Sequence, residues 1–159
     1  MAESMWIKID GCNGEATDDQ HKGEIDIQSF SWGMTHPVSA TGTGQSMGES
    51  TASDLNVMKL VDKASPNLMK FCMNAKVFGE VLLTCRKRGE TPIDYMKIKM
   101  KNALISSVQN SGAAEGGPLS ESVAFAFTAV EVEYTPQKDD GSADGAVTMK
   151  WDFAKNKEG

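Results

Sequence analysis

The sequence predicts a mainly β fold: an antiparallel β-barrel of two packed sheets, with one short flanking α-helix and a long extended loop. Three observations predict it. Short segments in which apolar and polar residues alternate recur along the 159 residues, and a period of two is typical of strands with two unlike faces. Glycine-rich stretches separate these segments, and only one segment has helical spacing. Many short strands with such connections are typical of barrels.

We expect the fold to be organised around the segment at 21–33, HKGEIDIQSFSWG. Its alternation changes parity at Phe30, from which point Phe30 and Trp32 are the large apolar residues. Ser29 and Ser31 are the small polar residues between them. Because successive side chains of a strand point to opposite faces, one face should bury the two rings and the other should present the hydroxyl groups.

The remaining strands follow from the same alternation. A straight strand over 119–134 would reach roughly 50 Å, which exceeds the diameter of a domain with a radius of gyration of roughly 15 Å. We therefore predict a β-bulge at Thr128 and Ala129, which would bend the strand and exchange its faces. The other predicted strands span 5–9, 55–61, 81–86, 93–100, 104–109 and 147–153, with a short break near Asn102.

One segment predicts a helix of about ten residues, a length that is marginal without tertiary packing. Ser65 is a good N-cap, and Pro66 suits the first helical position. Apolar residues four apart between positions 68 and 73 form a stripe on one side. The helix should therefore lie against a sheet.

The loop at 34–54 is long and has almost no core-forming residues. Loops of this length are uncommon inside compact domains and are usually functional or disordered. A long loop of this kind suits a contact with a neighbouring molecule, made by backbone hydrogen bonds and by Met34 or Met47.

Composition excludes several functional classes. The net charge of −6 argues against sequence-independent binding of nucleic acid, and no apolar run is long enough for membrane insertion. The first residues lack the features of a signal peptide, so we expect none. The three cysteines are widely spaced, which predicts reduced thiols in a protein that folds in the cytoplasm.

The sequence contains no recognisable catalytic constellation. His21 and His36 each stand beside a turn signal without ligand partners at fixed spacing, which predicts polar surface residues. The glycines at 42–48 do not fit a phosphate-binding motif, and no serine lies in a G-x-S-x-G setting. We therefore expect no catalytic, cofactor or metal site, no bound cofactor and no enzymatic activity.

A second pattern leaves two interpretations open. Lys97, Lys99 and Lys101 alternate with apolar residues on one predicted strand. They indicate either a solvated strand face or a charged strip at a subunit or cargo interface. The ten methionines likewise suit core filling or an adaptable binding surface.

Several motifs together resemble the haemolysin-coregulated protein (Hcp) family over essentially the whole chain. Each motif alone is modest, but they occur in order and at the family's length. They are GE at 14–15, HKGEID at 21–26, FSWGM at 30–34, DKASPNLMKF at 62–71, LISSVQNSG at 104–112 and VEVEYTPQKDDGSADG at 130–145.

The resemblance implies a single barrel domain over 1–159, without the C-terminal toxin domain that some members have. It implies a homohexameric ring and head-to-tail stacking of rings into the inner tube of a type VI secretion system. The implied partners are effector proteins in the lumen, the tip spike protein and the contractile sheath. It also implies assembly in the cytoplasm followed by secretion through that apparatus.

On this basis we expect Ser29 and Ser31 to face the lumen and the cargo. The expected loop between subunits extends from position 35 to 54, and a monomeric ligand- or cargo-binding β-barrel is the competing hypothesis. The residues expected in the inter-subunit loop are Met34, Thr35, Thr41, Gly42, Gly44, Met47, Gly48 and Ser50.

Overall fold

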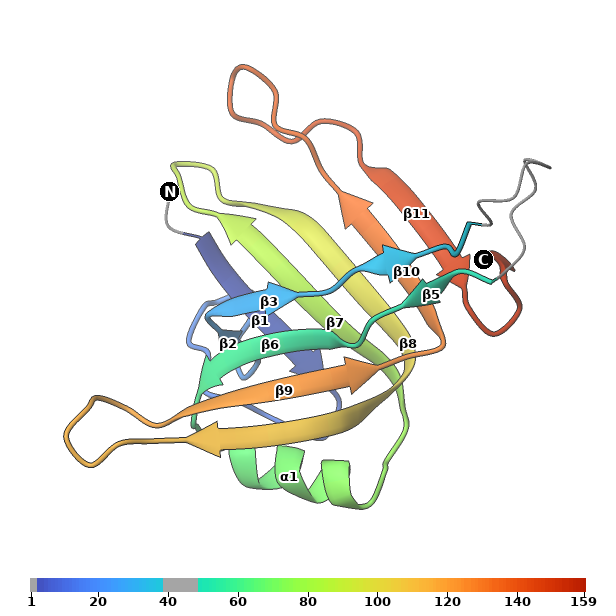
Figure 1. Ribbon diagram of the computed structural model, residues 1–159. Coiled ribbons are helices and arrows are strands. Elements are labelled where there is room, and N and C mark those ends of the chain that lie inside the picture. Colours follow the sequence, from blue (N-terminus) through green and yellow to red (C-terminus); the bar gives the residue numbers. More distant parts are fainter. Residues whose placement is uncertain (1–2, 39–48) are drawn as a thin grey trace.

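The computed structural model describes residues 3–38 and 49–159 and shows strands wrapped around one core, with a single helix below them (Figure 1). The fold is mainly β and antiparallel, as predicted. Its elements are β1 (Glu3–Ile9), β2 (Ile25–Ile27), β3 (Ser29–Ser31), β4 (Met34–Thr35), β5 (Thr51–Ala52), β6 (Leu55–Leu60), α1 (Ser65–Met73), β7 (Phe78–Lys87), β8 (Ile93–Ser111), β9 (Ser120–Ala126), β10 (Ala129–Tyr134), β11 (Val147–Asp152) and β12 (Lys157–Glu158).

Two sheets share the long strand β8. The larger sheet has the order β12-β11-β10-β8-β7-β1-β2, and the smaller one runs from β3 through β6 and β9 to the second part of β8. Because β2 pairs only with β1 while β3 pairs with β6, the chain passes between the sheets at Gln28. The Gln28 N–H donates to the Met58 carbonyl over 2.8 Å there, but no ladder joins β2 to β6. The barrel is therefore nearly closed.

The sequence predicts two separate strands at 93–100 and 104–109, but the structure has a single strand there, β8. The break expected near Asn102 is an irregularity inside one strand, where Asn102 has a φ of +48°. Before it, β8 pairs with β7 and β10; after it, Ala103 still pairs with Phe78 of β7, and the strand then pairs with β9. A left-handed residue turns the chain without ending its hydrogen bonding, so β8 crosses from one sheet to the other.

The predicted bulge at Thr128 and Ala129 is wrong. Ala126 pairs with Leu104 and Ala129 pairs with Lys101, so each strand has two residues between these pairs and neither has an extra one. The chain still changes sheets and faces here, because both strands bend together. The extra residue lies in β8, where the register shifts between Ile105 and Ser107.

The helix α1 is confirmed, but its start differs from the prediction. Ala64 occupies the N-cap position without a side-chain hydrogen bond, and Ser65 is already helical. The Ser65 hydroxyl instead donates to Glu121 Oε1 over 2.6 Å. The helix buries Leu68 and Phe71 against the barrel, whereas Met73 is exposed and does not belong to the buried stripe.

The core lies between the two sheets, and α1 packs against it from one side (Figure 1). Apolar side chains from every long strand fill it, which is expected for a small barrel whose interior leaves no room for a ligand. A hollow of only about 10 Å³ remains among them. The fully buried large apolar residues include Ile7, Ile25, Leu55, Val57, Leu68, Leu83, Ile98, Met100, Ile105 and Phe125.

Candidate functional site

The outer face of the smaller sheet has no charged residue at any position that the strand register places on it. Residues that pair across neighbouring strands lie on the same face of a sheet. Ser29 of β3 pairs with Met58 of β6, Met58 pairs with Ser122 of β9, and Ser122 pairs with Gln109 of β8. Ser31 likewise pairs with Asn56. Residues with small polar side chains dominate. We call this the uncharged face, and its members are Ser29, Ser31, Asn56, Met58, Leu60, Ser107, Gln109, Ser111, Ser120, Ser122 and Ala124.

The two serines and two aromatic residues of the central segment face as the alternation predicts. Ser29 and Ser31 are exposed on the uncharged face. Phe30 and Trp32 pack against the core from the other side of the chain. The Trp32 ring also makes an edge contact with the ring of Phe127, with centroids 6.0 Å apart. The aromatic rings therefore anchor this segment and leave its hydroxyl groups accessible.

The long loop leaves the barrel through a short two-stranded stem. We define the loop stem as β4, β5, His36 and Ser50. Thr35 Oγ1 lies 3.1 Å from Thr51 Oγ1, and His36 Nδ1 lies 3.0 Å from Ser50 Oγ. The Met34 side chain is 53% exposed. The other predicted loop residues, Thr41, Gly42, Gly44, Met47 and Gly48, lie outside the described residues.

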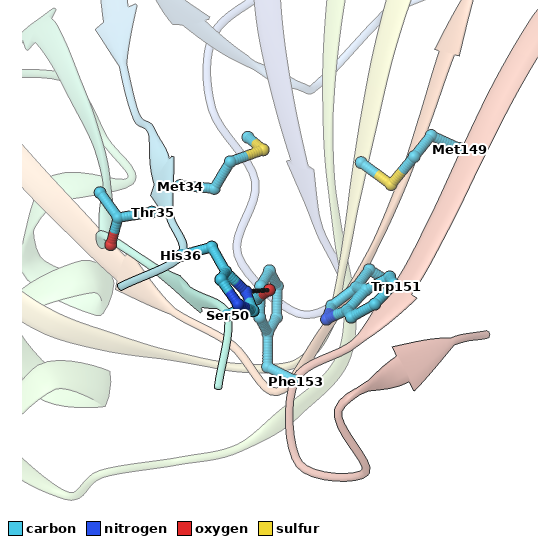
Figure 2. A pocket seen from close by; sticks show the side chains of 7 residues that line it. All are labelled: Met34, Thr35, His36, Ser50, Met149, Trp151 and Phe153. Atoms are coloured by element: carbon cyan, nitrogen blue, oxygen red, sulfur yellow. Dashed lines mark hydrogen bonds between the residues drawn. The ribbon is translucent and has the colours of Figure 1, made fainter. Parts of the chain in front are cut away.

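A pocket of about 410 Å³ separates the loop stem from β11 (Figure 2). Met34 lines it from the stem, and Met149, Trp151 and Phe153 line it from β11 and the residues that follow. Among the described residues, the buried Trp151 Nε1 has no hydrogen-bond partner. The sequence did not indicate this pocket, because one wall comes from residues up to Ser50 and the other begins at Met149.

Lys97, Lys99 and Lys101 point outward from the larger sheet, on the side opposite the core. The register places Lys97 beside Glu133 and Lys99 beside Glu131. Lys101 forms an ion pair with Glu80 of β7. Because carboxylates flank the whole row, this arrangement favours a solvated face over a charged strip.

The histidines and cysteines form no metal site in the described part of the chain. Contrary to the prediction of a surface residue, His21 is 7% exposed and lies in a cluster of charged side chains. Cys12 and Cys85 are buried free thiols, and burial is the largest cause that raises the pKa of each to about 11. No helix in the described residues is long and apolar enough to cross a membrane.

Comparison with known proteins identifies the family. Residues 6–134 match the family model described as type VI secretion system effector, Hcp. The chain is 40% identical over 159 residues to protein hcp1 of Pseudomonas aeruginosa, covering 98% of both chains.

Two solved structures agree with this assignment. A type six secretion system protein superposes with a TM-score of 0.93 at 30% identity, covering 99% of this chain and 100% of the other. Hcp1 from Salmonella typhimurium superposes with a TM-score of 0.81 at 33% identity, covering 99% of both. The chain therefore belongs to the Hcp family of type VI secretion system proteins.

Proposed function

We propose that this protein is a structural subunit of the type VI secretion tube. Six copies close into a ring, rings stack head to tail, and the lumen carries effector proteins. The observation that supports this most is the uncharged face, because charged residues make up 24% of the chain and yet none stands there. A surface without charge is what the inner wall of a protein-conducting channel requires.

The physical reason is the strength of electrostatic interactions in a narrow space. A wall with one sign of charge would attract cargo of the opposite sign and repel cargo of the same sign. Hydroxyl and amide groups exchange hydrogen bonds with water at little net cost. Ser29 and Ser31 would then leave room for cargo and hold it weakly, while Met58 offers an adaptable apolar contact.

The loop stem supports contact between subunits. Its exposed Met34 and the pocket beside it place apolar surface where the long loop leaves the barrel. A head-to-tail contact closes into a ring when each subunit repeats the same rotation. Met34, Thr35 and Ser50 would lie in that contact, together with the loop residues from Thr41 to Gly48.

The remaining partners and the absence of catalysis belong to the same proposal. The tube would contact the tip spike protein at its end and the contractile sheath around it. Assembly would take place in the cytoplasm, and secretion would follow through the apparatus. We propose no enzymatic activity, cofactor, nucleic acid or membrane insertion. The alternative of a ligand-binding barrel is disfavoured because side chains fill the interior.

A gold-labelling experiment tests which face lines the lumen. In a Cys72→Ser background, Ser31→Cys would be labelled with maleimide-coated gold and imaged by electron microscopy. The matched control is Lys99→Cys on the outer face of the larger sheet. We expect gold at the ring centre for position 31 and at the rim for position 99. Gold at the rim for position 31 would contradict the proposal.

A further inference from the structure

Residues 11–24 form a strap that folds back on itself beside the larger sheet. The amide of Gly14 donates to the Gly23 carbonyl over 2.8 Å, and that of Ala16 donates to the Glu24 carbonyl over 3.0 Å. Side chains attach the strap to three strands, and Trp6 of β1 is buried at this point. His21 lies at the centre of these attachments.

His21 has a carboxyl group at each ring nitrogen. Nδ1 is 2.7 Å from Glu24 Oε2 within the strap, and Nε2 is 3.1 Å from Asp94 Oδ2 of β8. An ionised carboxylate can only accept, so the imidazolium form, which donates from both ring nitrogens, is the form that satisfies both contacts. The ring also stacks on Trp6, with centroids 4.1 Å apart and planes at 9°. A positive ring gains from that contact.

Arg86 is the other cation beside the carboxyl groups that surround His21. Arg86 of β7 donates to Asp94 Oδ1 over 2.7 Å and to Asp18 Oδ2 over 2.8 Å. The cluster therefore holds three carboxyl groups, on Asp18, Glu24 and Asp94, and one guanidinium. Burial raises the pKa of Asp18, but hydrogen bonds from the Gln20 amide and from Arg86 lower it, and the net pKa of this carboxyl group lies below its usual value. A proton on His21 would supply a second positive charge to the cluster.

We propose that the strap is a proton-dependent clamp, which is closed while His21 is protonated and loosens as the pH rises past neutrality. Loss of one ring proton to solvent leaves a nitrogen lone pair facing a carboxylate in a part-buried site. One hydrogen bond is lost and one negative charge is left uncompensated. The bonds from Arg86 to Asp18 and Asp94 remain, so the strap loosens around His21 while the sheet beneath it stays folded.

Hydrogen exchange measured by mass spectrometry on the full chain tests the clamp at about pH 6 and about pH 8, the range in which histidine changes charge. Rates are corrected with an unstructured peptide of the strap sequence. A hydrogen bond to a charged group contributes about 1.5–3 kcal/mol. We therefore expect the protection of strap amides to fall at least about tenfold between the two pH values. Peptides from β7 and β8 should change little.

Two variants assign the effect to one residue. His21→Gln should give a strap whose protection is low and equal at both pH values. His36→Gln removes the other histidine of the chain and should keep the dependence of the unaltered protein. Equal protection at both pH values in the unaltered protein would overturn the proposal. So would a pH dependence that persists in His21→Gln or disappears in His36→Gln.

Discussion

At the scale of single residues, a buried ion pair connects β6 and β9 of the smaller sheet to each other and to α1. Lys59 of β6 is only 1% exposed, and its ammonium group contacts Glu121 of β9. It also donates to Asp62 Oδ1 over 3.0 Å and to the Leu60 carbonyl over 2.9 Å. Removing one charge of such a pair leaves the other buried without compensation.

A double-mutant cycle tests this pair. Lys59→Met should lower the free energy of unfolding by roughly 3–5 kcal/mol, because the buried Glu121 then loses its charged partner. Adding Glu121→Leu should recover much of that loss, since two apolar residues can replace a buried pair at little cost. Urea denaturation of the unaltered protein, Lys59→Met, Glu121→Leu and the double variant completes the cycle. A double variant that is less stable than Lys59→Met would contradict the account.

Gly14 illustrates a residue whose identity is imposed by close contact. A Cβ atom at this position would lie 2.6 Å from the Glu24 carbonyl oxygen and 2.6 Å from Ile25 Cα. Gly14→Ala should therefore destabilise the protein by about 1–3 kcal/mol, as other overpacked sites do. Gly79→Ala is the matched control, because nothing lies within 4 Å of its Cβ position. Thermal unfolding of both variants provides the measurement, and equal melting temperatures would refute the contact.

At the scale of elements, β8 shows what local periodicity can and cannot predict. The break in alternation near Asn102 was visible in the sequence, because a left-handed residue disturbs the period of two. Whether hydrogen bonding continues across the break depends on β7, β9 and β10, which the local pattern does not include. The prediction of a bulge at Thr128 was wrong for the same reason, because the local pattern does not show how the neighbouring strand pairs there.

Substitutions at Asn102 test the crossing between sheets. Asn102→Gly should change stability little, because glycine adopts a positive φ freely and only a 3.3 Å side-chain bond to Thr128 is lost. Asn102→Val should cost roughly 1–2 kcal/mol or more, because a branched residue resists the left-handed conformation. Chemical denaturation compares the two. Equal stability of the Gly and Val variants would argue against the conformation described for this strand.

The candidate site could be predicted from the sequence only where neighbouring residues in the chain determine it. The facing of Ser29, Ser31 and Trp32 follows from alternation within five residues, and the structure confirms it. The burial of His21 was missed, because Trp6 and Asp94 reach it from distant parts of the chain. Likewise, the whole uncharged face becomes visible only once the register aligns four strands.

At the scale of the whole molecule, the two sheets present outer faces of different character. The larger sheet has rows of lysine beside rows of glutamate across β8 and β10. The smaller sheet presents the uncharged face. In the tube proposed above, each subunit would turn the uncharged face towards cargo and the larger sheet towards water or a surrounding partner. Alternation separates the buried side of each strand from its outer side, and the residue types at the outer positions then set the character of each outer face.

The loop stem places the proposed contact between copies at one end of the smaller sheet. Replacing the segment from Thr41 to Ser50 by a short Gly-Ser turn removes most of the loop and leaves the barrel unchanged. We expect this variant to fold, as circular dichroism would show, and to form smaller particles than the unaltered protein. A shortened protein that still forms the complete ring would show that the loop is not a main connector.

The mass of the unaltered protein in solution tests the central claim most directly. Light scattering coupled to size-exclusion chromatography, at micromolar concentration, should give a particle of six copies of the 17.1 kDa chain. A monomer across the accessible concentration range would contradict the proposal of a ring-forming tube subunit.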